Sequence, residues 1–249
     1  LFTEIAAVHR QAFSALAPDS RLLIQADGAV KILSPQMLGR LHFDAASELG
    51  EHPSPARLIL PIAEQPLLLA FTVSGRVALL RWEFAGQQPG KLERFLPDSL
   101  EGEQVVQVLP LPSQGSLGLL SSDGRFKRLP VEDFQELSGR ATSVLKLKEG
   151  VTLRRVVSGQ EGDTLVVASS TGRMLRLNLN EANLPLMGRA AQGPMLMRLL
   201  PGEAVVGAAC VPSPPDDSPA EDQATVVLAT AGGQLKRLLV SSLRPCQRG

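Results

Sequence analysis

One phrase recurs five times in this chain of 249 residues: an apolar run, a turn ending in glycine, and a second apolar run. The five copies are LLIQADGAVKIL, LAFTVSGRVALL, GLLSSDGRFKRL, VVASSTGRMLRL and VLATAGGQLKRL. Their turn glycines, called pivots below, are Gly28, Gly75, Gly124, Gly172 and Gly233, so the intervals are 47, 49, 48 and 61 residues. A period of roughly 40 to 50 residues is typical of propeller-like rings, because one blade cannot bury both of its faces alone.

The long fourth interval has a visible cause. Residues 212–223 read PSPPDDSPAEDQ, a proline-rich acidic run with little apolar surface to bury. We expect a flexible surface insertion there, and without these twelve residues the interval becomes 49. Residues 1–20 are expected to lead into the repeats, with helical spacing between Glu4 and Leu16, which makes 21–249 one domain.

Each phrase predicts a β-hairpin. The pivots follow Asp27, Ser74, Asp123, Thr171 and Gly232, and an Asp-Gly or Gly-Gly pair between apolar runs is typical of a two-residue hairpin turn. Apolar residues stand two and five positions after every pivot, and these offsets place them on opposite faces of a strand. Both faces of each sheet should therefore be covered, as in blades packed around an axis.

Two shorter elements recur between the hairpins. Gly-Arg or Gly-Lys pairs occur at residues 39, 90, 139 and 188, and a turn glycine opens the β-rich segments 100–108, 148–156 and 200–208. One repeat then holds three to four strands. The predicted fold class is all-β, a propeller-like ring of about five four-stranded blades with very little helix.

The order of these elements resembles the C-terminal domain of the A subunit of bacterial type IIA topoisomerases, DNA gyrase and topoisomerase IV. The clearest stretch is GRAAQGPMLMRLLPGEAVVGAACV (188–211), similar to the segments that connect blades in that family, and the resemblance covers roughly residues 20–249. It implies a β-pinwheel, a disc whose blades exchange an outer strand with their neighbours and whose outer rim bends or wraps duplex DNA. It also implies an ATP-dependent enzyme that controls DNA supercoiling, with two kinds of protein partner, a B subunit plus the remainder of the A subunit.

One departure leaves the parent enzyme open. Gyrase carries a Gln-Arg-Arg-Gly-Gly-Lys-Gly box, and the nearest fragment here is Gln247-Arg248-Gly249. The topoisomerase IV proteins usually have degenerate boxes, so the resemblance does not distinguish the two.

Charge placement independently favours DNA. The chain has 25 basic and 25 acidic residues, yet the nine-residue windows that begin at the pivots hold ten basic and two acidic side chains. The net charge is therefore +8 in these windows and −8 elsewhere, and repeated cations suit sequence-independent phosphate contact. The candidate DNA-binding residues are Lys31, Arg125, Lys127, Arg128, Arg173, Arg176, Lys236 and Arg237. The alternative is a solvated face of charges that protects edge strands from aggregation.

Catalysis by this chain alone is not indicated. Type IIA topoisomerases cleave DNA with a tyrosine, and the chain has none; its three histidines and two cysteines show no metal-ligand or nucleophile spacing. We expect no catalytic residue, metal, cofactor or small-molecule substrate. There is no apolar run of about 18 residues and no secretory signal, so we expect a cytoplasmic protein without a membrane anchor.

Two other functions remain open. Blade rings also serve as protein-interaction platforms, which the neutral net charge favours. A glycosidase-like propeller would need paired carboxylates, and no blade position carries a recurring acid.

Overall fold

The computed structural model describes residues 11–12, 16–40, 56–137, 139–212 and 224–245. Most of the predicted lead-in at 1–20 and almost all of the predicted insertion at 212–223 lie outside the described residues.

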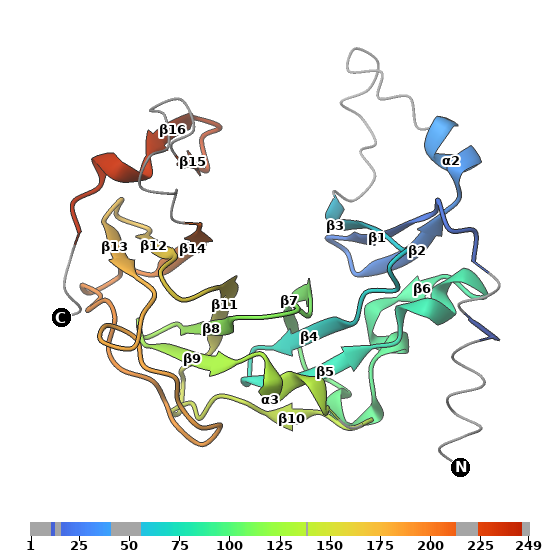
Figure 1. Ribbon diagram of the computed structural model, residues 1–249, viewed down its shortest axis with the longest axis horizontal. Helices are drawn as coiled ribbons and strands as arrows, with labels where there is room; N and C mark the ends of the chain where they lie inside the picture. The colour runs from blue at the N-terminus through green and yellow to red at the C-terminus, as the bar shows by residue number, and fades with distance from the viewer. Residues whose placement is uncertain (1–10, 13–15, 41–55, 138, 213–223, 246–249) are drawn as a thin grey trace.

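The described chain is built from antiparallel sheets that follow one another along the sequence (Figure 1). The strands are β1 (Arg21–Gln25), β2 (Ala29–Leu33), β3 (Ala56–Pro61), β4 (Leu68–Thr72), β5 (Arg76–Leu80), β6 (Gly90–Lys91), β7 (Val105–Pro110), β8 (Ser116–Ser121), β9 (Phe126–Pro130), β10 (Thr142–Ser143), β11 (Leu153–Gly159), β12 (Thr164–Ser169), β13 (Met174–Asn178), β14 (Val205–Val211), β15 (Thr225–Ala229) and β16 (Leu235–Leu239). We call the sheets the first to fifth blades: β3-β1-β2-β6, β7-β4-β5-β10, β11-β8-β9, β13-β12-β14 and β15-β16. The predicted all-β pinwheel is confirmed, although the fifth blade is a bare hairpin within the described residues.

Helices are short and lie between the strands. They are α2 (Pro35–Arg40), α3 (Glu132–Gln135), η1 (Trp82–Gly86), η2 (Leu92–Phe95), η3 (Asp98–Leu100) and η5 (Val240–Ser242), the last four being 3₁₀ helices. We call the segment between one hairpin and the edge strand that follows it a connector.

All five pivot glycines lie in turns and have positive φ, between 78° and 84°. The predicted two-residue turn, however, is wrong. In the first blade three residues separate Gln25 from Ala29, and the amide of Gly28 donates to the Gln25 carbonyl. Among the described residues the one non-glycine with positive φ is Gln65, so the residues before the pivots keep negative φ. A three-residue loop with glycine alone in the left-handed region tolerates β-branched Thr171, which a two-residue turn would strain.

The blades exchange strands, as the resemblance implied. The connector that follows the second hairpin supplies β6 to the first blade, where Gly90 pairs with Val30. In the same way β10 follows the third hairpin and pairs with β5 of the second blade. The third blade receives two isolated bridges from the next connector, between Arg125 and Met195 and between Arg128 and Leu186. Each blade thus lies beside chain from the repeat that follows it.

Three apolar clusters fill the interfaces between consecutive blades. The residue two positions after a pivot enters the interface with the following blade, as Val77 and Phe126 do. The residue five positions after a pivot enters the interface with the preceding blade, as Leu80 and Leu129 do. The opposite-face prediction is therefore confirmed for the middle blades.

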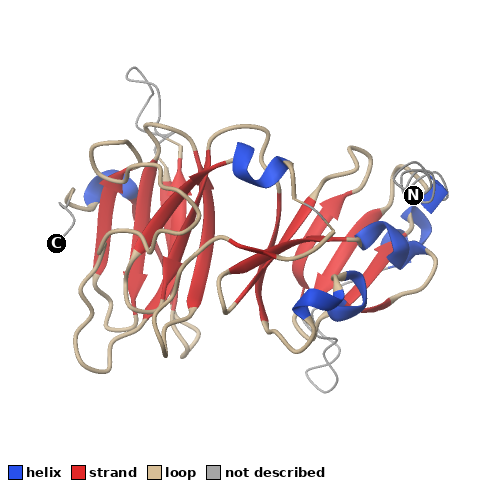
Figure 2. Ribbon diagram, turned by 90° about the horizontal axis from the view of Figure 1, so that it is seen from below, coloured by secondary structure: helices blue, strands red, loops and turns tan. Residues whose placement is uncertain are grey.

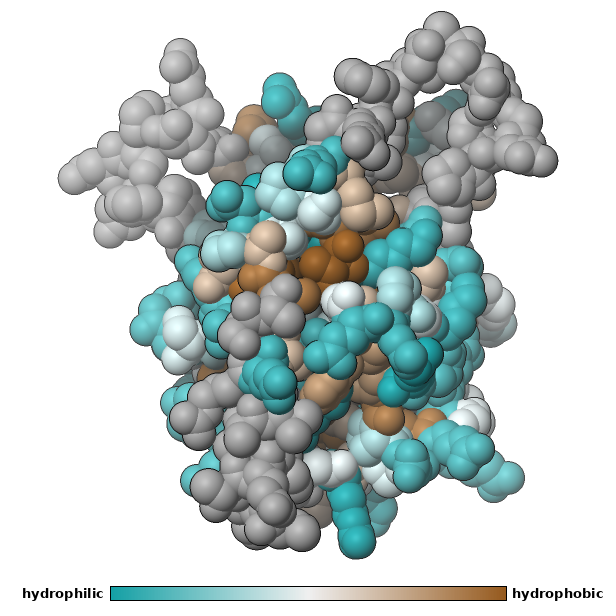
Figure 3. All heavy atoms as spheres, turned by 90° about the vertical axis from the view of Figure 1, so that its right-hand side faces the viewer, coloured by the Kyte–Doolittle hydropathy of each residue, from teal (hydrophilic) through white to brown (hydrophobic). Residues whose placement is uncertain are grey.

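The described blades form an open arc, with β1 and β3 at one end and β15 and β16 at the other (Figure 1). Viewed from below, the strands at the left-hand end run across the thickness of the disc (Figure 2). The right-hand end is mostly hydrophilic around a small apolar area (Figure 3). In the fifth hairpin Leu235, two positions after its pivot, is 74% exposed.

Candidate nucleic-acid interface

The hairpin cations stand one, three or four positions after a pivot, on the second strand of each hairpin or just before it. Connector residues pair with the second strand of several hairpins. A cation on that strand is therefore exposed only where no connector residue covers it.

Lys127, three positions after its pivot on β9, has no exposed surface. Its Nζ donates to the carbonyls of Val144 and Arg189, each at 2.6 Å, from two different connectors. Burial lowers the pKa of the Lys127 ammonium to about 8, although the charge of Asp133 acts in the opposite direction. A buried ammonium held by two carbonyls does not reach a duplex, so the prediction that Lys127 contacts DNA is wrong.

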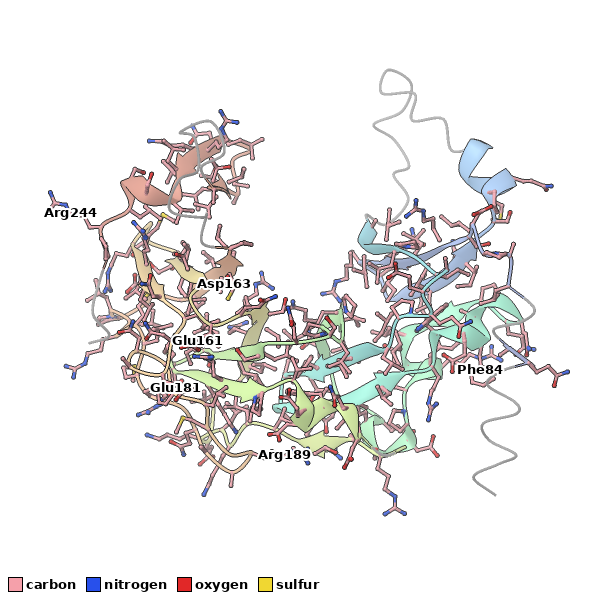
Figure 4. All side chains as sticks on the ribbon, in the orientation of Figure 1. Phe84, Glu161, Asp163, Glu181, Arg189 and Arg244 are labelled. Atoms are coloured by element: carbon pink, nitrogen blue, oxygen red, sulfur yellow. The ribbon has the colours of Figure 1, made fainter. Side chains whose placement is uncertain are left out.

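Arg128, the next residue on β9, is 3% exposed. Its Nη1 donates to the Leu184 carbonyl at 2.9 Å, its Nε to Ser116 Oγ at 3.2 Å, and its Nη2 to Glu161 at 2.8 Å. The hydrogen bond from Arg128 lowers the pKa of the Glu161 carboxyl, which lies in the left-hand part of the arc (Figure 4). Arg128 fastens the hairpin to the next connector, so we remove it from the candidates as well.

Arg176 occupies the same place in the fourth blade. Its Nη1 donates to the Leu243 carbonyl at 3.0 Å, as Nη1 of Arg128 does to Leu184. Its Nε is buried without a hydrogen-bond partner in the described structure. Arg176 is half-buried and is at most a partial phosphate contact.

Arg173, one position after its pivot, binds a carboxylate beneath the turn. Its Nη1 lies 2.7 Å from Glu203 Oε2 and 3.1 Å from the Arg198 carbonyl. Hydrogen bonds from Ser169 and Thr171 lower the pKa of Glu203 to about 2, with further help from the Leu200 amide and Arg173. The charge of Arg173 is therefore largely compensated inside the protein.

The second blade has the same arrangement, which the sequence analysis missed. Arg76 Nη1 lies 2.6 Å from Glu103 Oε1 and 2.7 Å from the Ser99 carbonyl. Burial alone would raise the pKa of Glu103, but hydrogen bonds from Ser74, Thr72 and Arg76 outweigh it and lower the value. The signal was present, since Gly-Glu precedes the edge strand in both blades.

Arg125, at the same position in the third blade, donates from Nη1 to the Gly193 carbonyl at 3.0 Å. Its Nε lies 3.4 Å from Asp123 Oδ2, and the side chain is 27% exposed.

Three of the predicted candidates are exposed and carry no ion pair within the described residues: Lys31, Lys236 and Arg237. Lys31 and Lys236 stand at the position of Lys127, but both are exposed.

The connectors contribute cations that the hairpin windows left out. Some are paired: Lys91 Nζ lies 2.7 Å from Asp27, and Arg189, on the lower rim in Figure 4, binds Asp133. Others are exposed and have no acidic partner in the described part of the chain, namely Lys146, Lys148 and Arg198, and the same holds for Arg154 on the edge strand β11. Exposed cations from hairpins and connectors together form the candidate interface.

Comparison with known proteins agrees with this architecture. The family described as DNA gyrase C-terminal domain, beta-propeller, matches residues 119–158, 163–212 and 224–249, which are the third, fourth and fifth repeats. The last three repeats of the chain belong to this family. Among curated relatives, the A subunit of DNA topoisomerase 4 from Synechocystis sp. is 37% identical over 167 residues, 61% of this chain and 17% of that protein. The A subunit of DNA gyrase from Granulibacter bethesdensis is 34% identical over 122 residues, 46% of this chain and 13% of that protein.

The fold likeness extends over nearly the whole chain. The crystal structure of the C-terminal domain of DNA topoisomerase IV superposes with a TM-score of 0.68 at 17% identity, covering 92% of this chain and 70% of that one. The matched part of the chain thus spans less than a fifth of the length of the two relatives named above, and the chain covers most of the solved C-terminal domain. No helix among the described residues is long and apolar enough to cross a membrane.

Proposed function

We propose that this pinwheel is the non-catalytic DNA-binding domain of a type IIA topoisomerase A subunit, gyrase or topoisomerase IV, and that it bends or wraps duplex DNA. Its partners would be duplex DNA, the B subunit, and the remainder of the A subunit. The supporting observation is the set of exposed, unpaired cations on the first and fifth hairpins and on the connectors after the third and fourth hairpins. Affinity from such a surface comes from phosphate neutralisation and counterion release, without base readout.

Binding of a labelled duplex at several salt concentrations tests the proposal. Replacing both Lys236 and Arg237 with Gln should flatten the slope of log affinity against log salt by about 1.8, since each neutralised phosphate contributes roughly 0.9. Folding should be unaffected, because both side chains are exposed.

A matched control removes the same charge from cations that already have partners. Lys91→Gln with Arg189→Gln should change the slope much less, because Asp27 and Asp133 compensate these charges in the free domain. Equal slopes for the two double variants would reject the assignment of the interface to the unpaired cations.

A protein-interaction platform is the second candidate. The exposed Val227 and Leu235 on the fifth hairpin favour it, because apolar surface of this kind is common at protein interfaces. A duplex affinity that is absent or independent of salt would favour this function over DNA binding.

A further inference from the structure

The turn of the third blade differs from its neighbours in the residue beneath it. In the second and fourth blades a glutamate, Glu103 or Glu203, lies under the turn and binds the arginine that follows the pivot. At the corresponding place the third blade has Val151, so Arg125 lacks this carboxylate.

The backbone at this place is the same in all three blades. The preceding glycines have φ of 76°, 74° and 77° at residues 102, 150 and 202. The amide of Val151 donates to the Lys148 carbonyl at 3.1 Å, and those of Glu103 and Glu203 make the same bond at 3.0 and 2.9 Å. The difference is therefore confined to the side chain, and position 151 can hold a glutamate without backbone change.

Arg125 is left with an unused donor. Its Nε is buried and has no hydrogen-bond partner in the described structure, although Asp123 Oδ2 lies 3.4 Å away. The Asp123 carboxylate also accepts a hydrogen bond from the Ser121 hydroxyl. An acceptor oxygen at this turn would satisfy a donor that the protein leaves open.

Two further cations lie at the same turn. Lys146, Lys148, Arg125 and Gln192 border a shallow crevice that has no room for a water molecule, so an anion would lie at its mouth, and Asp123 is the one acid among the bordering residues. Both lysines are exposed and unpaired in the part of the chain that is described, whereas the fourth blade has Leu200 in place of Lys148. Three cations against one carboxylate give this turn a net charge of +2, which makes it suited to an anion.

We propose that the third-blade turn is a phosphate site on the DNA path, where Arg125, Lys146 and Lys148 hold one phosphodiester of the duplex. A phosphodiester oxygen accepts the hydrogen bonds that a glutamate accepts in the neighbouring blades. The proposal rests on the proposed DNA-binding function and names the strongest contact within it.

The decisive variant is Val151→Glu, which gives the third blade the carboxylate of its neighbours. The new glutamate should bind Arg125 as Glu103 binds Arg76. The phosphodiester should then no longer bind at this turn. We expect the melting temperature to be unchanged or higher and the salt slope for duplex binding to flatten by about 0.9. Val206→Glu, on the exposed edge strand β14, adds the same charge away from the turn and should leave the slope nearly unchanged.

The possible results distinguish failure of the third-blade phosphate site from failure of the proposed DNA-binding function. A wild-type domain with no salt-dependent duplex affinity rejects the DNA-binding function itself. Wild-type binding with the same slope in Val151→Glu, or equal losses in Val151→Glu and Val206→Glu, rejects the site alone. If Val151→Glu fails to fold, Lys146→Gln with Lys148→Gln tests the site without touching the turn, and an unaltered slope again overturns it.

The same turn could bind a free phosphate ion instead of a DNA phosphodiester. Thermal melting with added inorganic phosphate at constant ionic strength measures binding of the free ion. Stabilisation by phosphate in the wild type but not in Val151→Glu, together with an unaltered duplex slope, would assign the site to free phosphate and overturn the DNA contact.

Discussion

Arginines at one repeated position serve a structural purpose in this domain. Arg128 and Arg176 both stand four positions after a pivot, and each donates from Nη1 to a carbonyl of the following connector. Charge-assisted hydrogen bonds to carbonyls satisfy the connector backbone, which has no strand partner there. A repeated cation in a repeat protein therefore marks a repeated contact, and exposure decides whether that contact is internal or with a ligand.

The buried Lys127 should make the free energy of unfolding depend on pH. Its pKa is about 8 in the folded protein, below the ordinary value of 10.5. Between these two values the unfolded chain binds more protons than the folded one, so the contribution of Lys127 to the free energy of unfolding rises with pH. That contribution is complete above about pH 10.5 and is lost as the pH falls to about 8.

Urea denaturation of wild type and Lys127→Met at about pH 7.5, 9 and 10.5 measures this effect. The difference in free energy of unfolding, wild type minus variant, should increase from about pH 7.5 to about pH 10.5. The other titrating groups are common to both proteins and cancel in this difference. Curves that stay parallel would show that the ammonium is not desolvated.

At the scale of the hairpin, each second strand joins two interfaces. Leu129 packs against the preceding blade and Phe126 against the following one, and each is at most 1% exposed. Leu129→Ala should lower the free energy of unfolding by about 2 to 5 kcal/mol, the usual cost of a cavity at a buried leucine.

Leu235→Ala is the exposed control, because it removes the same side chain from a hairpin of the same sequence pattern, where Leu235 is 74% exposed. It should change stability by less than about 0.5 kcal/mol in either direction. Thermal or urea unfolding compares the two, and similar losses would mean that the fifth hairpin is as well packed as the third.

The hairpins were predictable from the sequence because their signals are local. Apolar residues two and five positions after each glycine identified the strands and both covered faces. The burial of Lys127 was not predictable, since its acceptors lie 17 and 62 residues away along the chain. The turn class was missed because Asp-Gly suits both a two-residue and a three-residue loop, and Thr171 was the residue that favoured the second.

For the whole molecule, the open arc makes stability local to pairs of neighbouring blades. The fourth blade is closed by the segment after the fifth hairpin, through the Leu243 carbonyl and a bridge between Arg176 and Pro245. The third blade is closed earlier, by residues 186 and 195.

Truncation after residue 212 should therefore raise amide hydrogen exchange in β13 and leave exchange in β9 near its original rate. Mass spectrometry of peptides from the two strands measures this. Equal increases in both would show that the arc unfolds as one cooperative unit.

Strand exchange also sets the order in which this domain can be completed during translation. The second strand of the first blade ends at residue 33, while its outer strand is not synthesised until residues 90 and 91. A ribosome must therefore extend the nascent chain through a whole further hairpin before the blade behind it can close. Each unfinished blade has an open sheet edge in the meantime, which makes the interval between repeats the time during which the nascent domain is most exposed to mispairing.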